Sequence, residues 1–312
     1  MRKIAMNGCL TLLLSVGLSA EAVSADVAEE FTAEHRDFFH LFRAPVPEIA
    51  LGASYQPSTQ EESGSAEFDR AKWYGKFEIP IPTATERYLR FGGEYEQGIY
   101  DFKDADDGET AVSSKTLHRI VLHAGYGFFL NPDLLLTGIA SPGIFSDLDG
   151  SVDENDFDMQ GNALIVYRFN PGAQLIAGVR VGEEYDDWPV LPLAGIRLLS
   201  EDGSTHISVT LPLEARVGYY LDPSTELYTG LWVTGDEYQA ELGPDDTELN
   251  IQVQDRRIGG GARFLFSDHL SLSIEGGVAL QSEFDFEAEQ TNHFRGDVDP
   301  TGYIALQLGI RL

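Results

Sequence analysis

The stretch "GYIALQLGIRL", residues 302–312, closes the chain and decides the fold class. Its apolar residues recur at every second position, so an extended strand would place five aliphatic side chains on one face: Ile304, Leu306, Leu308, Ile310 and Leu312. Tyr303, Gln307 and Arg311 would lie on the other face. A frayed tail has no reason to alternate in this way. The chain is therefore expected to end as a strand that belongs to the main fold.

The same alternation recurs throughout the chain, for example in "KWYGKFEIPI" (72–81), "TLHRIVLHAGYGFF" (116–129) and "HLSLSIEGGVALQ" (269–281). A period of two indicates β-strands. After Pro47 no segment shows a convincing amphipathic helix of useful length. The sequence therefore predicts an all-β fold.

The connections between these runs alternate between two kinds. Short ones, rich in turn formers, lie at 80–85, 131–133, 170–172, 200–203, 222–225 and 267–269. Long acidic ones lie at 57–66, 102–114, 147–157, 183–189, 236–248 and 284–299. In an up-and-down sheet the short connections collect at one end and the long ones at the other. That asymmetry is typical of a transmembrane up-and-down antiparallel β-barrel of the outer membrane.

Proline sets the strand count. Pro212 cannot donate a ladder hydrogen bond, and dividing "ISVTLPLEARVGYYL" (207–221) at this residue keeps the short and long connections in alternation. The division predicts fourteen strands, an even number as in bacterial single-chain barrels. Twelve strands remain the alternative if the short strands around Pro212 are not both in the wall.

The N-terminal region predicts export. Arg2 and Lys3 precede an apolar run that ends in Val23-Ser24-Ala25, which is typical of a secretory signal peptide, residues 1–25. The run is too short for a transmembrane helix. Residues 26–47 are then an N-terminal periplasmic segment, and 48–312 the barrel. In the segment, five side chains could share one helical face: Phe31, His35, Phe38, Phe39 and Phe42. Such a helix could plug the lumen or rest on the membrane; a mobile terminus is the alternative.

Composition excludes several classes. The chain carries a formal charge of −30, and without residues 1–25, which hold Arg2, Lys3 and Glu21, 19 basic and 50 acidic residues leave −31. Nucleic acid is therefore not expected as a partner. The single cysteine, Cys9, lies in the signal peptide, so neither disulfides nor cysteine-ligated metals are expected in the barrel. No cofactor and no metal site are predicted.

A soluble sandwich shows the same alternation with its apolar face inside. Strand candidates of about 9 to 14 residues match a tilted membrane crossing instead. Aromatic residues also recur near strand ends, as in an interfacial girdle: Tyr55, Trp73, Tyr88, Phe128, Phe129, Tyr167, Phe169, Tyr219, Tyr220, Phe264 and Phe266. The aliphatic faces are therefore expected to face lipid and lipopolysaccharide of the bacterial outer membrane.

The chain also resembles an uncharacterised group of Gram-negative outer-membrane barrels of porin-like type. The resemblance lies in "LPLAGIRLL" (191–199) and "ISVTLPLEARVGYYL", about a tenth of the chain. The closing stretch resembles the C-terminal assembly signal of such proteins, with Leu312 in place of the terminal aromatic residue. The resemblance implies a barrel and no particular activity.

The strand faces opposite the aliphatic ones are charged. Thirteen residues are predicted to line the lumen: Arg70, Lys72, Lys76, Arg90, Glu94, Glu96, Arg119, Arg168, Arg180, Arg197, Arg216, Arg263 and Glu275. Arg257 and Arg311 share this face. Rings of opposite charge select solutes in water-filled pores, which predicts a passive or gated channel for small hydrophilic solutes. Paired charges that fill a closed or plugged barrel are the alternative.

The acidic loops suggest a second function. Clustered carboxylates outside the cell attract divalent cations, so a non-transporting surface barrel that binds a partner, a cation or lipopolysaccharide is the competing hypothesis. Catalysis is not expected, because the histidines are scattered. His206 and Ser208 form only an i, i+2 pair on one strand face.

Overall fold

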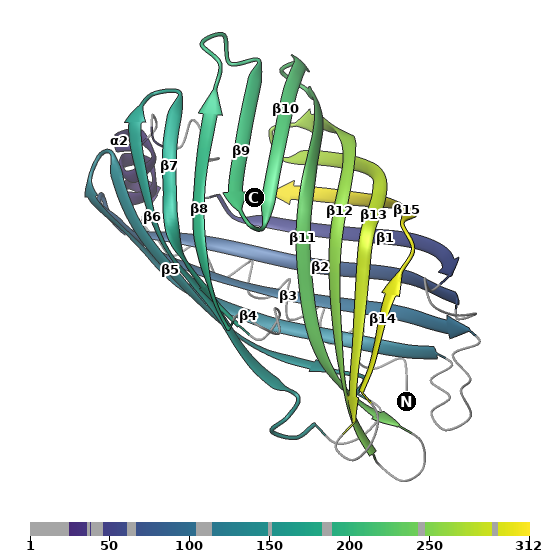
Figure 1. Cartoon of the computed structure of the whole chain (residues 1–312). Helices are drawn as coiled ribbons and strands as arrows, with labels where there is room; N and C mark the ends of the chain where they lie inside the picture. The colour runs from purple at the N-terminus through teal and green to yellow at the C-terminus, as the bar shows by residue number, and fades with distance from the viewer. Residues whose placement is uncertain are drawn as a thin grey trace.

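The computed structural model describes residues 25–35, 38, 46–60, 67–103, 114–148, 152–182, 189–242, 247–288 and 293–312. They form one helix, α2 (Ala25–Glu34), and a single antiparallel sheet that curls into a barrel (Figure 1). The strands are β1 (Glu48–Gln60), β2 (Glu67–Ala84), β3 (Arg87–Lys103), β4 (Ser114–Asn131), β5 (Leu134–Ser146), β6 (Phe157–Asn170), β7 (Ala173–Val181), β8 (Val190–Leu199), β9 (Thr205–Leu211), β10 (Glu214–Asp222), β11 (Thr225–Leu242), β12 (Thr247–Ser267), β13 (Leu270–Ala288), β14 (His293–Val298) and β15 (Thr301–Arg311). None of the described helices is long and apolar enough to cross a membrane.

The barrel closes through the C-terminal strand. β15 pairs with β1 from Glu48↔Arg311 to Tyr55↔Ile304, and with β13 on its other side. β14 pairs with the far part of β13, so β14 and β15 are two pieces of one wall strand, interrupted at Asp299 and Pro300. The wall therefore has fourteen strands. The predicted fold class and strand count are confirmed, including the division at Pro212 between β9 and β10.

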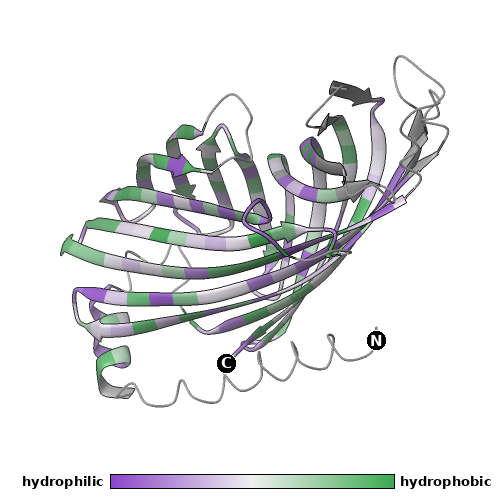
Figure 2. Ribbon diagram, turned by 90° about the horizontal axis from the view of Figure 1, so that it is seen from below, coloured by the Kyte–Doolittle hydropathy of each residue, from purple (hydrophilic) through white to green (hydrophobic). Residues whose placement is uncertain are grey.

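The alternating side chains point as predicted. In β15, Ile304 is 52% exposed on the outside, whereas Tyr303 is 6% exposed on the inside. Hydrophobic and hydrophilic residues alternate along the strands in Figure 2. The sheet thus turns aliphatic side chains outward around most of the wall, and encloses the polar ones.

Side chains stabilise the short turns. The carboxylate of Asp202 accepts hydrogen bonds from the Ser200 hydroxyl (2.6 Å) and the Ser204 amide (3.0 Å), which lower the pKa of Asp202 to about 2. Asn131, Asn170 and Asp222 accept a hydrogen bond from the amide two residues on in the same way. These Asx-type contacts are why the chain reverses there in a few residues.

The predicted short connection at 80–85 is present but shorter than expected, since only Thr85 and Glu86 form the turn. β2 continues to Ala84, and Pro80 and Pro82 pair with β3 as Pro80↔Arg90 and Pro82↔Tyr88. The pairing of β1 with β2 ends at Glu48↔Glu78, so beyond Glu78 no described strand pairs with that edge of β2. A proline whose missing N–H faces a free edge removes no ladder hydrogen bond.

Two predicted acidic loops are largely strands. β11 and β12 stay paired to Leu242↔Thr247, so most of 236–248 is a hairpin, and β13 and β14 pair within 284–298. Strand propensity is low for acidic residues, but the ladder begun in the wall continues through them. Residues 61–66, 104–113, 149–151 and 183–188 of the other predicted loops lie outside the described residues.

Strands β7 to β10, of 7 to 10 residues, are shorter than β6 and β11 on either side. β9 has 7 residues and β10 has 9, whereas β11 has 18 and β12 has 21. Beyond the ends of these short strands, β5 meets β11 directly, through the pair Ser146↔Gln239 and a hydrogen bond from the Asp147 amide to the Gln239 carbonyl (3.1 Å). The long-loop end is thus closed by fewer strands than the rest of the barrel (Figure 1).

The N-terminal segment packs inside the short-turn end. Phe31 and Phe38, both at most 1% exposed, join a buried cluster on the inner wall: Tyr88, Phe129, Leu135, Val166 and Ile176. Tyr88 and Phe129 were predicted to belong to an interfacial girdle, and that prediction is wrong. Both lie on the inward positions of their strands, where they receive the N-terminal segment. Tyr55, Trp73, Tyr167, Phe169 and Tyr219 do lie exposed on the outside.

Candidate functional site

The barrel encloses two polar cavities. Chamber 1, of about 440 Å³, lies between β10–β13 and β15 on one side and β1–β3 on the other. Chamber 2, of about 450 Å³, lies along β1–β7. Arg119 of β4 and Arg180 of β7 line both, so the chambers adjoin there. Chamber 1 also reaches Leu213 in the β9–β10 turn and Thr234 of β11, beside the short strands.

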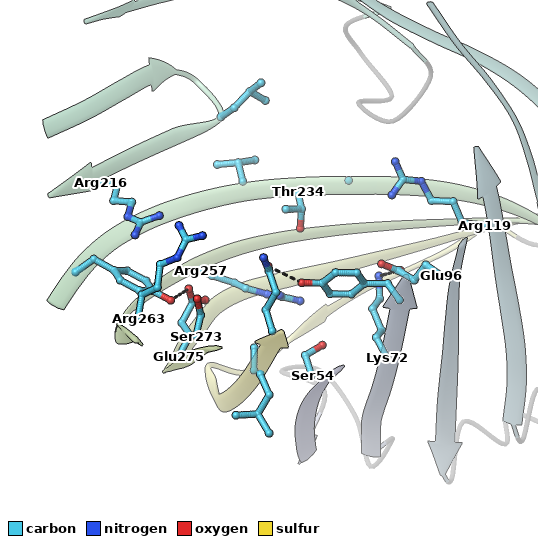
Figure 3. A pocket seen from close by; sticks show the side chains of 18 of the residues that line it. Ser54, Lys72, Glu96, Arg119, Arg216, Thr234, Arg257, Arg263, Ser273 and Glu275 are labelled. Atoms are coloured by element: carbon cyan, nitrogen blue, oxygen red, sulfur yellow. Dashed lines mark hydrogen bonds and ion pairs between the residues drawn. The ribbon is translucent and has the colours of Figure 1, made fainter. Parts of the chain in front are cut away.

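Basic residues outnumber acidic ones in chamber 1. Its lining includes two carboxylates, Glu96 and Glu275, and six cations: Lys72, Arg119, Arg180, Arg216, Arg257 and Arg263. Figure 3 shows three of the arginines, from β10 and β12, gathered around Glu275, while Arg119 extends from the far side of the chamber. The alternation of the strands brings these residues, distant in sequence, to one space.

Several cations are held by carboxylates in or behind the lining. Lys72 Nζ lies 2.7 Å from Glu96, Arg216 pairs with Glu226 at 2.5 Å, and Arg257 pairs with Asp255 at 2.8 Å. The side chains of Glu226 and Asp255 are only 4% and 3% exposed. The guanidinium groups line the chamber, and their carboxylate partners lie deeper in the wall.

Tyrosines support this arrangement. The Tyr228 and Tyr303 hydroxyls each donate to a Glu275 carboxylate oxygen at 3.0 Å. The Arg216 guanidinium lies 4.0 Å from the Tyr228 ring centroid, a cation–π contact. The Tyr74 hydroxyl donates to Gln307 Oε1 at 2.8 Å. Neutral donors therefore satisfy Glu275, and within the part of the chain that the structure describes it forms no ion pair with the arginines beside it.

Arg263 differs from the other cations of chamber 1. Its only hydrogen bond is from Nη2 to Ser271 Oγ, at 3.4 Å, and it forms no ion pair within the described part of the chain. The burial of most of its side chain keeps much of its charge from solvent. This guanidinium faces the chamber without a carboxylate of its own.

Chamber 2 contains more balanced charges. Arg90 pairs with Glu78, and Arg119 Nη1 lies 3.0 Å from Glu94 Oε1. Lys76 also lines this chamber. The two ion pairs link β2 to β3 and β3 to β4 across the inner wall.

The long-loop end is closed by packed side chains. Arg70 of β2 lies 2.7 Å from Asp255 of β12 and donates to Gln56 Oε1 at 2.7 Å, and its side chain is 2% exposed. Because β2 and β12 are not neighbours in the sheet, this ion pair crosses the lumen. Tyr100, Tyr238 and other buried side chains pack around it. The described residues thus leave little room along the barrel axis here.

The N-terminal segment narrows the opposite end. His35 Nε2 donates to the Thr85 carbonyl at 2.6 Å, and its ring stacks on Phe129 with a centroid distance of 3.7 Å. Gln174 Nε2 donates to the Phe38 carbonyl at 2.8 Å. Backbone and side chains together fix the segment against β3–β7. The predicted partners Phe39 and Phe42 lie outside the described residues.

The thirteen predicted lumen residues fall into three groups. Lys72, Glu96, Arg119, Arg180, Arg216, Arg263 and Glu275 line chamber 1, and Lys76, Arg90 and Glu94 line chamber 2. Arg70 lies in the packed long-loop end. Arg168 forms an ion pair with Asp133 of the β4–β5 turn at 2.7 Å, and Arg197 lies on the inner side of β8 opposite Gln174; neither lines a chamber.

The neutral groups of the site were not among the thirteen predicted lumen residues. Tyr74, Tyr228, Tyr303 and Gln307 hold the charged side chains in place. Their inward position follows from the same alternation, but charge alone was used to select the lumen residues. The cross-lumen partner Asp255 was missed because pairing between strands that are not neighbours leaves no sequence signal.

The structure brings one serine to a histidine. Ser141 Oγ and His123 Nδ1 lie 2.9 Å apart in chamber 2, a contact that the sequence analysis did not anticipate. His206 lies 3.3 Å from Glu226 Oε1. A catalytic triad needs a third group to orient the imidazole, and no described hydrogen bond supplies one to His123. The described residues contain no group of three or more His, Cys, Asp or Glu that could hold a metal ion.

Solved structures with a similar fold include the COG4313 outer membrane channel from Pseudomonas putida F1, at 11% identity and a TM-score of 0.49, covering 86% of this chain and 96% of that one. The P. putida toluene transporter TodX is similar at 9% identity and a TM-score of 0.41, covering 88% and 92%. A Pseudomonas aeruginosa FadL homologue is similar at 10% identity and 0.39, covering 87% and 93%.

No curated protein matches the sequence. A protein family does match, over nearly the whole barrel. Residues 53–305 fit the family described as a domain of unknown function, DUF6268, and the chain belongs to that family.

Proposed function

We propose that the protein is a channel of the bacterial outer membrane for small hydrophilic solutes. The observation that carries this proposal is the pair of adjoining polar chambers inside a wall whose outer face is aliphatic. Water and ions are stable in such an interior, and acyl chains are stable against such an exterior. The charged side chains on the inner wall would then select solutes by charge and size.

The route through the barrel is proposed to avoid the packed long-loop end. Chamber 1 extends to Leu213 and Thr234, on the side of the barrel where β8–β10 are short. There β5 contacts β11 beyond the ends of the short strands. Solutes are expected to reach the chambers at this side of the barrel. The N-terminal segment covers the β3–β7 part of the short-turn end and would act as a removable obstruction there.

The test is ion conductance of the refolded full chain in planar bilayers. Discrete current steps are expected, and the Phe31→Ala variant, which loosens the N-terminal segment, should conduct more. No current above background from either protein would reject the channel. Flux of small sugars into proteoliposomes would show whether uncharged hydrophilic solutes also pass.

A non-transporting surface barrel is the second candidate. The observation that favours it is the packed long-loop end, where Arg70, Asp255 and Tyr238 are each at most 2% exposed. In this case the acidic residues outside would bind a cation, a partner or lipopolysaccharide. Binding of Ca²⁺ or lipopolysaccharide without conductance, including in Phe31→Ala, is the result expected of this candidate.

A further inference from the structure

The charge of chamber 1 points to a particular class of solute. Its lining carries six cations and two carboxylates. The ion-pair partners directly behind the lining add one cation, Arg70, and three carboxylates, Glu94, Glu226 and Asp255. Cations thus remain in the majority among the described residues at the chamber. This positive lining lies inside a chain whose formal charge is −30.

Like charges gathered in one cavity repel each other unless an anion lies among them. The low-dielectric wall also concentrates the positive potential in the cavity and raises the local concentration of anions. The positive lining therefore favours an anionic solute.

Arg263 provides the most direct contact. It lines the chamber with one weak hydrogen bond, to Ser271, and no ion pair within the described residues. The Arg216 guanidinium, also at the chamber, is fixed by Glu226 and the Tyr228 ring. A guanidinium group without a carboxylate, beside one held rigidly, suits the bidentate recognition of an oxyanion.

Neutral donors and the size of the chamber complete the site. Ser54 and Ser273 line it, and Gln307 accepts from Tyr74 through its oxygen, so its amide N–H groups remain available. At about 30 Å³ per water molecule, 440 Å³ holds roughly fifteen waters. The space suits a small hydrated solute and excludes a polymer.

We infer that chamber 1 binds small oxyanions, such as inorganic phosphate or a four-carbon dicarboxylate, with Arg263 as the main contact. The inference deepens the proposed channel, since it names the class of solute that the same cavity selects. Binding at equilibrium does not require passage, so the site and the channel can fail separately.

The test is calorimetric titration of the full chain in detergent with inorganic phosphate, a four-carbon dicarboxylate and a neutral sugar. Both anions are expected to bind and the sugar is not. Arg263→Gln should weaken anion binding about tenfold or more, the value of one hydrogen bond to a charged group. Arg168→Gln is the matched control, because Arg168 also lies on an inward face but is paired with Asp133 and lines neither chamber. Arg216 is left intact, since its removal would leave Glu226 buried without that partner.

The outcomes are distinct. Equal affinity of wild type and Arg263→Gln, or no preference for the anions over the sugar, would overturn the inference. Binding that Arg263→Gln weakens, with no current in bilayers, would support the anion site and reject the channel. Current whose reversal potential in a KCl gradient indicates cation preference, together with no anion binding, would keep the channel and reject the anion site. Heat-dependent gel mobility checks that every variant is folded.

Discussion

At the residue scale, the cross-lumen ion pair shows where sequence reasoning ends. Alternation predicted that Arg70 faces inward, and it does. It could not predict that Asp255, four strands away around the wall, would be its partner at 2.7 Å. Contacts between distant strands depend on the diameter and tilt of the closed barrel, and no local pattern of residues records either quantity.

The same residue gives a stability prediction. Arg70→Met removes a buried guanidinium from Asp255, whose ion pair with Arg257 at 2.8 Å would remain. Taking one partner from a buried ion pair leaves part of the other ion's desolvation cost uncompensated, so a loss of about 3 kcal/mol in the free energy of unfolding is expected. Urea-induced unfolding in detergent micelles or vesicles measures it.

Arg87→Met is the control for this change. Arg87 pairs with Glu86 at 3.3 Å, but the two side chains are 50% and 42% exposed. An exposed pair contributes at most about 1 kcal/mol. Equal losses for the two variants would contradict the view that Arg70 and Asp255 form a structural closure of the lumen.

At the element scale, the N-terminal segment was half predictable. The sequence placed Phe31, His35 and Phe38 on one helical face, and all three are buried. It could not decide between a plug and a mobile terminus, because the receiving surface depends on Tyr88 and Phe129 facing inward. Those two aromatics were assigned to the outside, since an aromatic residue near a strand end fits a girdle equally well.

Removing the central ring of the segment should release it. Phe31 is 0% exposed within the aromatic cluster, so Phe31→Ala is expected to cost about 3 kcal/mol of packing. That loss is comparable to the free energy that stabilises so short a segment against the barrel. The N-terminal segment should therefore detach in the variant. Limited proteolysis then cuts the segment faster in the variant, while the barrel stays resistant.

Thr32→Ala provides the control on the neighbouring, exposed position of α2. Its cleavage rate and its conductance are expected to match the wild type. Equal cleavage rates for wild type and Phe31→Ala would mean that the aromatic cluster does not hold the segment in place.

At the scale of the whole molecule, closure and strand number were predictable because every wall strand carries its own alternation. The direct contact between β5 and β11 was not, since Ser146 and Gln239 are polar residues with no periodic signal. The extent of the long strands was also missed. The acidic residues that were predicted as loops continue the strand ladder, because the strands on which they lie are already paired in the wall.

A disulfide tests the β5–β11 contact. Ser146 and Gln239 are bridge partners, so cysteines at both positions are expected to form a disulfide under mild oxidation. Cys9 is the only cysteine of the sequence, and it lies in the predicted signal peptide. Faster migration on a non-reducing gel, reversed by a reductant, is the readout.

The control pair is Ser146→Cys with Thr225→Cys. Thr225 lies at the opposite end of β11, so no disulfide is expected. If the first pair also stayed reduced, β5 and β11 would not meet, and the long-loop end would be wider than described.

The short strands have a consequence for the surrounding bilayer. Seven residues of β9, at about 3.3 Å each and tilted by about 45°, rise only about 16 Å, whereas outer-membrane barrels present an apolar band of about 25 Å. In the proposed membrane location, acyl chains beside β8–β10 would have to compress or splay to meet so low a hydrophobic edge, while those beside β11–β13 would not. The barrel is therefore expected to thin the bilayer on one side and to favour lipids with shorter tails there.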